Sequence, residues 1–308
     1  MTNAAQPSRE DTSGISAGVA PPGYRLPAEM RLGEVRLQVA DLARSLEYYQ
    51  QVLGLRLLER TGSTAVLGAF GSDEPLVRLF ERPGSTPVSQ RGLLGLYHFA
   101  ILLPDRAALG RFVTHLAEIG VRVGSADHLV SEALYLRDPD GLGIEVYADR
   151  PRTAWLVDDR QLRMASEPLD LVGVVGAAGG ERWSGMPAGT RMGHVHLHVG
   201  DIERASRFYH AALGLDRMVW NYPGALFLAA GGYHHHLGLN TWAGAGARAA
   251  AEGDARLLEW RLLLPSEHAD AARASVEAAG HTVTTTDEGW RVLDPWGTTL
   301  HVVAERAR

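Results

Sequence analysis

Short apolar strands, each followed by a polar residue and an amphipathic helix, recur four times along the chain. The segments begin at Gly33 (GEVRLQVADLARSLEYYQQVLG), Leu96 (LYHFAILLPDRAALGRFVTHLAEIG), Gly193 (GHVHLHVGDIERASRFYHAALG) and Leu258 (LEWRLLLPSEHADAARASVEAAG). Apolar side chains in the second segment recur at helical spacing and share one face: Leu109, Phe112, Val113, Leu116 and Ile119. After each helix come two or three strand-like runs separated by turns, as in ALYLRDPDGLGIEVYA. The pattern predicts a βαβββ unit repeated four times, and a repeat of this kind governs the fold.

Each predicted helix carries start and stop signals. A residue whose side-chain oxygen can cap a helix N-terminus precedes each helix: Asp41, Asp105, Asp201 and Ser266. A glycine, which adopts the left-handed conformation of a C-cap, follows each helix: Gly54, Gly120, Gly214 and Gly280.

A single βαβββ unit cannot bury both faces of its sheet, so two units must combine. We expect two domains, 29–150 and 192–305, joined by a linker over 151–191. The linker is long and Gly-rich, so units can pair across the domains as well as within them. The expected units span 30–83, 95–150, 192–243 and 256–305.

Length and composition are those of a globular protein. The 308 residues are 45% hydrophobic and 21% charged, with enough chain for two sizeable cores. Residues 1–28 are polar and rich in Ser, Pro and Gly, which predicts a disordered arm without the apolar core of a signal peptide. No apolar run is long enough to span a membrane, and we expect a cytoplasmic protein. The net charge of -6 gives no support to a nucleic-acid or membrane partner.

The side chains present in the sequence limit the types of reaction that the protein can catalyse. The chain has no cysteine and no lysine, which excludes disulfides, a thiol nucleophile and Schiff-base chemistry. Thirteen histidines remain as the unusual resource. His194, His196 and His198 alternate onto one strand face, and His234, His235 and His236 form a run within GGYHHHLGL. Buried imidazoles are costly unless they are paired or bound.

The fourfold βαβββ plan, with GHVHLHVGD and DPDGLGIEV, resembles the vicinal oxygen chelate superfamily. This superfamily includes glyoxalase I, the bleomycin-resistance proteins and the type I extradiol dioxygenases. The resemblance covers residues 30–305. It implies an α+β fold in which paired units curl into cup-shaped, glyoxalase-like sheets. It also implies a metal held by side chains from the first and last strands of the units.

Counting along the chain gives the candidate ligands. The first-strand position lies seven residues before each capping residue and is occupied by Glu34, His98, His194 and Glu259. The last-strand position lies seven residues beyond the Asp of Asp-Pro-x-Gly and is occupied by Glu145 in unit two and His301 in unit four. A non-haem Fe(II) oxygenase uses two imidazoles and one carboxylate.

Three pairings of units compete for the metal. Units one and two would offer Glu34, His98 and Glu145, with a single imidazole. Units three and four would offer His194, Glu259 and His301, which is the right composition. Units two and three would offer His98, Glu145 and His194, which is also right. Composition alone leaves these last two open.

The resemblance favours units two and three. In type I extradiol enzymes, the unit that supplies the ligand Glu also carries a Tyr ten residues before it and an active-site His further upstream. Tyr135 stands ten residues before Glu145, and His128 stands seven before Tyr135. The resemblance therefore implies a site of His98, Glu145 and His194 that holds Fe(II) or Mn(II), with His128 and Tyr135 as catalytic residues.

The histidine run also finds a place through the resemblance. Extradiol enzymes carry an acid–base His in this strand region, followed by a polar residue, which matches His235 and His236. Asn240 and Trp242 complete the expected substrate-binding set with His236. Regular alternation would put His235 on the face opposite His236 and Asn240, although a bulge after Gly231-Gly232 would change this. We interpret His196 and His198 as structural.

The resulting expectation is an extradiol ring-cleaving dioxygenase that acts on a small aromatic diol with O2. Homo-oligomers are compatible with the sequence. The alternatives are a glyoxalase-type lyase or isomerase, with Glu34 or Glu259 as a base, and a small-molecule-binding protein of the bleomycin-resistance kind.

Overall fold

Four βαβββ units build the chain, as the repeat predicts. The computed structural model describes residues 17–89 and 92–305. Unit one contains β1 (Arg31–Val39), α1 (Leu42–Gln51), β2 (Arg56–Thr61), β3 (Thr64–Gly68) and β4 (Pro75–Glu81). Unit two contains β5 (Gly95–Leu102), α2 (Arg106–Glu118), β6 (Gly124–Asp127), β7 (Ser131–Arg137) and β8 (Gly143–Asp149). Unit three contains β11 (Arg191–His198), α4 (Ile202–Ser206) running on into the π-helical η2 (Arg207–Ala212), β12 (Asp216–Val219), β13 (Ala225–Ala229) and β14 (Leu237–Asn240). Unit four contains β15 (Arg256–Pro265), α5 (Ser266–Ala278), β16 (Val283–Thr286), β17 (Gly289–Leu293) and β18 (Thr299–Glu305).

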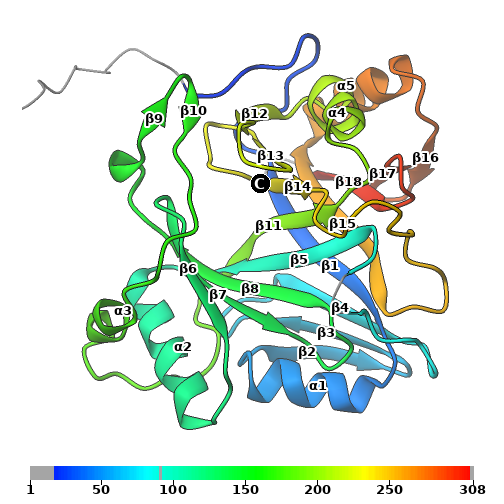
Figure 1. Cartoon of the computed structure of the whole chain (residues 1–308). Coiled ribbons are helices and arrows are strands. Elements are labelled where there is room, and N and C mark those ends of the chain that lie inside the picture. Colours follow the sequence, from blue (N-terminus) through cyan, green and yellow to red (C-terminus); the bar gives the residue numbers. More distant parts are fainter. Residues whose placement is uncertain (1–16, 90–91, 306–308) are drawn as a thin grey trace, which may run out of the picture.

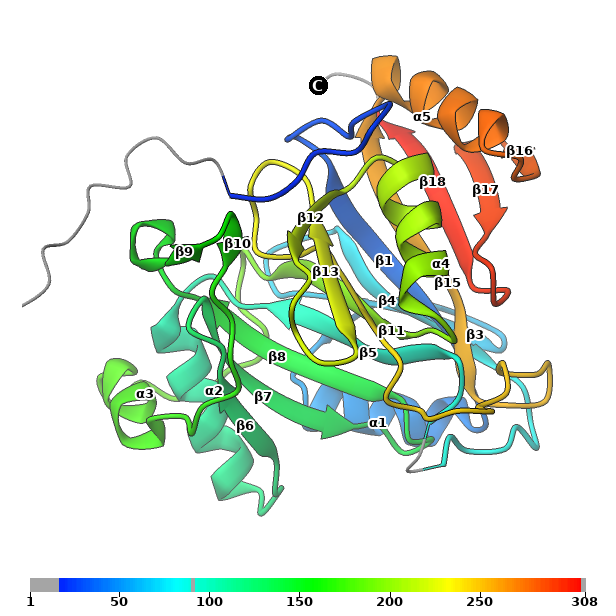
Figure 2. The same cartoon turned by 45° about the horizontal axis from the view of Figure 1, so that its top comes forward.

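The units assemble into two eight-stranded sheets. One sheet has the order β12-β13-β14-β11-β5-β8-β7-β6 and joins units two and three; we call it the 2/3 sheet. The other has the order β16-β17-β18-β15-β1-β4-β3-β2 and joins units one and four; we call it the 1/4 sheet. Helices α1 and α2 lie at one end of the molecule and α4 and α5 at the other (Figures 1 and 2). The α+β fold with two curled sheets is confirmed.

Each sheet takes one unit from each half of the chain. The antiparallel pairing of β5 with β11 joins the 2/3 sheet, and that of β1 with β15 joins the 1/4 sheet. Neither expected domain, 29–150 or 192–305, therefore forms a sheet of its own. Units pair across the halves, the option that the long linker left open.

Helix ends follow the predicted signals, with one exception. Asp41, Asp105 and Asp201 each accept a backbone N–H three residues ahead. The four C-terminal glycines all have positive φ, between 71° and 101°. Ser266 was expected to cap its helix, which is wrong: Pro265 is the N-cap and Ser266 is already the first helical residue.

The segment between the halves is folded against units two and three. It contains η1 (Arg152–Ala154), a small hairpin of β9 (Val157–Asp158) and β10 (Gln161–Leu162), and α3 (Leu171–Ala177). Helix α3 packs so closely on α2 that a Cβ at Gly110 would lie 2.2 Å from the Val174 carbonyl oxygen. The segment is thus part of the body of the protein and more than a linker.

The predicted disordered arm needs a correction where the structure describes it. Residues 1–16 lie outside the described residues, whereas 17–28 form an ordered strap along unit three. Val19 bridges to Arg217, and Arg25 forms a two-pronged ion pair with the buried carboxylate of Asp216. Leu26 is buried in the main core, and this apolar contact and the ion pair explain the order.

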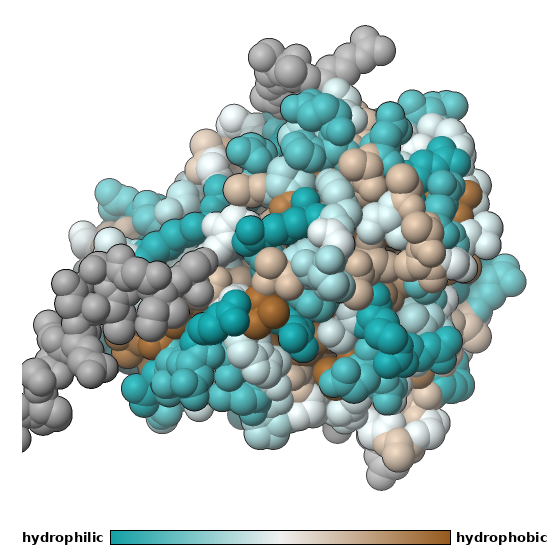
Figure 3. Space-filling view, turned by 90° about the horizontal axis from the view of Figure 1, so that it is seen from above, coloured by the Kyte–Doolittle hydropathy of each residue, from teal (hydrophilic) through white to brown (hydrophobic). Residues whose placement is uncertain are grey.

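One apolar core lies between the sheets and under the helices, and includes the fully buried rings of Tyr49, Phe99 and Trp260. The face seen from above is mostly hydrophilic, with hydrophobic residues scattered over it (Figure 3). Within residues 17–89 and 92–305, no helix is long and apolar enough to cross a membrane.

Candidate metal centre

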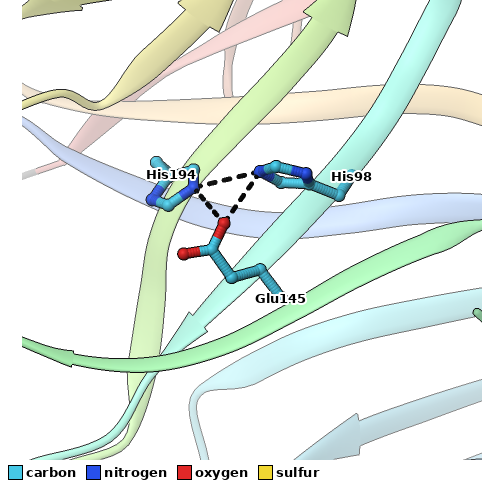
Figure 4. Close-up of side chains that lie close together, drawn as sticks. All are labelled: His98, Glu145 and His194. Carbon is cyan, nitrogen blue, oxygen red and sulfur yellow. Dashed lines mark hydrogen bonds and ion pairs between the residues drawn. The ribbon is translucent and has the colours of Figure 1, made fainter. Parts of the chain in front are cut away.

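Three neighbouring strands of the 2/3 sheet bring His98, Glu145 and His194 together. Strand β5 carries His98 between β8, which carries Glu145, and β11, which carries His194. Glu145 Oε2 lies 3.0 Å from His98 Nε2 and 3.2 Å from His194 Nε2, and the two Nε2 atoms are 3.2 Å apart. The three side chains point toward one another from separate strands (Figure 4). All three are buried.

The charge states of this cluster suit a cation. Burial would raise the pKa of Glu145, but His194 and His98 outweigh it and hold that pKa well below its usual range. Burial lowers the pKa of His98 and of His194, against the raising effect of Glu145. Near neutral pH the cluster is therefore a carboxylate with two neutral imidazoles, the protonation states in which these groups bind metals.

The donor set fits a divalent transition metal. One ligand atom from each of His98, Glu145 and His194 lies within 4.8 Å of the others. Two imidazoles and one carboxylate are the facial triad of non-haem Fe(II) oxygenases, which leaves positions open for other ligands. Nδ1 of His194 is buried and has no hydrogen-bond partner among the residues that the structure describes, so that ring is held by packing and by its Nε2 contacts.

A cavity of about 180 Å³ opens beside His98 and Glu145. Aromatic side chains form much of its wall: Tyr97, Tyr135, Tyr222, Phe227 and Trp242. Three further histidines reach it: His128, His196 and His235. Met164, Ala165 and Ser166 from the segment between the halves close one side. A flat aromatic molecule with polar substituents matches this mixture of rings and imidazoles.

Tyr135 and His128 lie beside the cluster and line the cavity. Tyr135 pairs with Glu145 across β7 and β8, and its ring centroid is 5.7 Å from that of His98. His128 Nδ1 donates to the Ala165 carbonyl at 2.7 Å, which leaves Nε2 as the acceptor for the Tyr135 hydroxyl. Burial, followed by Glu145, raises the pKa of Tyr135 well above its usual range, so the phenol stays protonated.

The histidine run lies in a turn and not within a strand. Gly231 and Gly232 have φ of 61° and 65°, a pair of left-handed residues that only glycine adopts easily. The turn carries the chain from β13 to β14 and sends His235 into the cavity. The His235 ring lies 4.0 Å from the His194 ring, centroid to centroid. Burial lowers the pKa of His235 well below its usual range.

The structure does not bring His236 or Asn240 to the cavity wall. His236 packs on Tyr233 and its Nδ1 accepts the backbone N–H of Ala230, so its expected contact with substrate has no support. Burial lowers the pKa of His236 to about 3. The buried Asn240 side chain joins two histidines, because its Oδ1 accepts from His198 Nδ1 at 2.6 Å and its Nδ2 donates to His196 Nε2 at 3.0 Å.

Trp242 lines the cavity. Its indole ring is 45% exposed and its N–H donates to the carbonyl of Pro223. The ring meets Tyr97 edge-on with centroids 5.8 Å apart. Trp242 therefore forms a wall at the open side of the cavity.

The 1/4 sheet carries ion pairs at the corresponding positions. Glu34, Glu259 and His301 lie there together, and none of them is near His194, so the pairing of units three and four does not form. Arg78 donates to both oxygens of Glu34 at 3.1 Å, and Arg291 pairs with Glu259. With their carboxylates occupied by guanidinium groups, these positions offer no open metal site.

Two parts of the cavity wall, His196 and residues 164–166, were not predicted from the sequence. His196 was interpreted as structural, yet its ring lines the cavity 4.9 Å from the His98 ring. Its alternation with His194 on one strand face was the available signal. Met164, Ala165 and Ser166 carry no recognisable motif and reach the cavity only through the path of the chain.

Comparison with known proteins shows the family of the chain. Residues 31–146 and 191–301 match the Glyoxalase/Bleomycin resistance protein/Dioxygenase superfamily. The chain belongs to this superfamily. A relative from Bacillus subtilis (strain 168), named catechol-2,3-dioxygenase, is 44% identical over 271 residues, which are 87% of this chain and 94% of the relative.

Two solved structures share the fold at lower identity. A putative dioxygenase from Bacillus subtilis aligns with a TM-score of 0.64 at 14% identity, over 91% of this chain and 86% of its own. Glyoxalase I from Zea mays aligns with a TM-score of 0.55 at 20% identity, over 90% of this chain and 92% of its own. The superfamily predicted from the sequence is thus confirmed, and these two likenesses concern the fold alone.

Proposed function

We propose that this protein is an extradiol ring-cleaving dioxygenase, an oxidoreductase that inserts O2 into catechol-like aromatic diols. The observation that carries the proposal is the convergence of His98, Glu145 and His194 at an aromatic-walled cavity. The name of the 44% identical relative points to the same reaction. A cytoplasmic location and the oligomeric state remain predictions from the sequence.

His98, Glu145 and His194 would hold Fe(II), or Mn(II) in its place. When bound, such a metal would supply the Lewis-acid and redox chemistry that the reaction of a diol with O2 requires. Tyr97, Tyr222 and Trp242 provide ring faces and edges against which a flat substrate can pack, and they exclude water from it.

The imidazole and phenol groups around the cavity are the proposed groups for proton transfer in the reaction. His235 is the proposed acid–base group, because it reaches the cavity next to His194. Tyr135, kept protonated by burial, would donate a hydrogen bond to a substrate oxygen and so stabilise developing negative charge. His128 would orient that hydroxyl through the hydrogen bond that its Nε2 accepts from it.

A glyoxalase-type isomerase needs a carboxylate base at the substrate, and the cavity does not provide a spare one. Among the residues that the structure describes, Glu145 is the one carboxylate that lines the cavity. Glu34 and Glu259, the candidate bases, lie in the 1/4 sheet with arginine partners. This difference favours the dioxygenase.

The test is to load anaerobically purified protein with Fe(II), or separately with Mn(II), and to add catechol and then air. We expect O2 uptake equal to the catechol consumed and a yellow ring-opened product. His98→Ala, which lacks a ligand, is the matched control and should take up no O2. Absence of O2 uptake by the wild-type protein with either metal would refute the proposal and would favour a small-molecule-binding protein.

A further inference from the structure

A buried chain of contacts leads from the end of β8 to the cavity. Asp149, the last residue of β8, lies with its Oδ1 2.8 Å from His234 Nε2. His234 Nδ1 lies 2.7 Å from His235 Nδ1. His234 is fully buried and Asp149 is partly exposed. This chain accounts for two of the three consecutive histidines.

The direction of each hydrogen bond follows from the carboxylate. An ionised Asp149 can only accept, so His234 Nε2 carries the hydrogen. In a neutral imidazole the other nitrogen then bears a lone pair, so His234 Nδ1 accepts from His235 Nδ1–H. His235 Nε2 is left with its own lone pair and has no hydrogen-bond partner among the described residues.

We infer that Asp149 and His234 are positioning residues that fix the tautomer and orientation of His235. In this arrangement His235 presents a hydrogen-bond acceptor, Nε2, to the cavity. A substrate hydroxyl, and not a deprotonated oxygen, is the group that such an acceptor recognises. The inference deepens the proposed function and rests on it for the identity of the substrate.

Tyr233 supports the same carboxylate. Its hydroxyl donates to Asp149 at 3.0 Å and lies 2.8 Å from the hydroxyl of Tyr147. Asp149 therefore accepts from two sides, which fixes the direction of its carboxylate. The alternative tautomer of His234 would place two lone pairs against each other at 2.8 Å, which is unfavourable.

The experiment compares Asp149→Ala with the matched variant Asp149→Glu, which keeps a carboxylate. Among the described residues Asp149 has no direct contact with the three ligands, so metal content should stay near wild type in both variants. We expect kcat of Asp149→Ala to fall about 10- to 100-fold, the scale typical of outer partners that orient a functional histidine. Asp149→Glu should recover most of it.

The tautomer itself can be measured without turnover. Histidine 15N chemical shifts of the zinc-loaded, diamagnetic protein distinguish a protonated ring nitrogen from an unprotonated one, and the signals lost in His235→Gln assign the residue. We expect His235 to be protonated at Nδ1 in wild type and Asp149→Glu, and to lose this preference in Asp149→Ala. A wild-type His235 protonated at Nε2 overturns the inference, as does an Asp149→Ala protein with wild-type shifts and kcat.

These two measurements separate the two proposals. If wild-type protein does not cleave catechol, the proposed function fails while the 15N shifts still decide the tautomer. If it cleaves catechol but Asp149→Glu is as impaired as Asp149→Ala, the positioning role fails and the proposed function stands.

Discussion

Residues at corresponding positions of the two sheets differ in chemical type and in their partners. The last-strand ligand position holds Glu145 in unit two, which faces two imidazoles, and His301 in unit four, whose Nδ1 lies 3.0 Å from Glu259. Within the part of the chain that the structure describes, Glu145 of the 2/3 sheet has no arginine partner, whereas Glu34 and Glu259 of the 1/4 sheet each have one or more. A carboxylate that is free of guanidinium partners is the one available to a cation.

Removal of a single ligand should therefore abolish metal binding in the 2/3 sheet alone. We expect the purified protein to hold about one Fe or Mn per chain, and His98→Ala or Glu145→Ala to lose it, because loss of one ligand removes most of the affinity. The matched control is His301→Ala, at the corresponding position of the 1/4 sheet, which should keep its metal. Metal analysis of the three variants decides; retention in both His98→Ala and Glu145→Ala would contradict the assignment.

His235→Ala should show a different phenotype. The His235 ring packs on the His194 ring but makes no hydrogen bond to His194 Nε2, the atom that faces Glu145. Metal and catechol binding should therefore survive. Turnover should fall by about 10²- to 10⁴-fold, the usual contribution of a general acid–base group. Steady-state kinetics with metal analysis measure both, and normal turnover would remove the role from His235.

Spacing along the chain was enough to predict part of the site. Counting back from the helix caps gave His98 and His194 as candidate ligands, and counting on from the Asp-Pro-x-Gly turn gave Glu145, because a strand has a fixed period. The resemblance then favoured these three over the other candidates. His236 and Asn240 could not be placed this way. Two successive left-handed glycines break the alternation before β14, and nothing in the residue types reveals which way the chain then turns.

At the level of elements, this turn between β13 and β14 sets the direction of the histidine run. Gly231 approaches the N-terminal strap so closely that a Cβ there would lie 3.0 Å from the Cβ of Ala28. Gly232 has the same positive φ but open space around it. A side chain at Gly232 would therefore meet only backbone strain, whereas a side chain at Gly231 would meet both backbone strain and a steric clash.

Gly232→Ala should lose about 1–2 kcal/mol of unfolding free energy, the cost of one residue in the left-handed region. Gly231→Ala should lose more, since it also displaces the strap, and it should reduce turnover by shifting His235. Denaturant unfolding and steady-state kinetics measure the two effects. Equal losses in the two variants would mean that the strap does not constrain the turn.

The ion pairs between β15, β17 and β18 make stability depend on pH. Burial alone would raise the pKa of Glu259, but hydrogen bonds from His301 and Arg291 lower it to about 2. A lowered pKa means that the folded protein binds fewer protons than the unfolded chain. The stabilisation is therefore complete above the unfolded pKa of about 4.5 and disappears as pH falls toward 2.

Glu259→Gln should accordingly be less stable than wild type by about 1–3 kcal/mol near neutral pH. The difference should shrink as pH falls from about 4.5 to 2, while the other carboxylates, common to both proteins, cancel. Denaturant unfolding at several pH values tests this. A difference that stays constant with pH would show that the carboxylate charge contributes nothing.

On the scale of the whole molecule, the metal ligands come from both halves of the chain. His98 and Glu145 belong to the first half and His194 to the second. The repeat pattern predicted the units and their strand content. It could not decide which units share a sheet, because all four have the same apolar pattern, and the favoured pairing came from Tyr135 and His128 instead.

A chain divided at the exposed glycines 179 and 180 should separate the ligands. We expect fragments 1–179 and 180–308 to bind metal weakly when alone, since neither holds all three ligands. Mixed, they should form a one-to-one complex with about one metal, because each sheet needs strands from both. Metal analysis after size-exclusion chromatography measures this. Full metal retention by fragment 1–179 alone would contradict the shared site.

Units two and three, which are consecutive in the sequence, form one sheet, and units one and four, which flank them in the sequence, form the other. A ribosome makes unit one first, yet β1 has to wait for β15, which ends at Pro265. The inner pair can close as soon as β14 has emerged, at Asn240. During synthesis, the 2/3 sheet, which holds the metal ligands, can thus be complete while β1 is paired with β4 and still lacks β15.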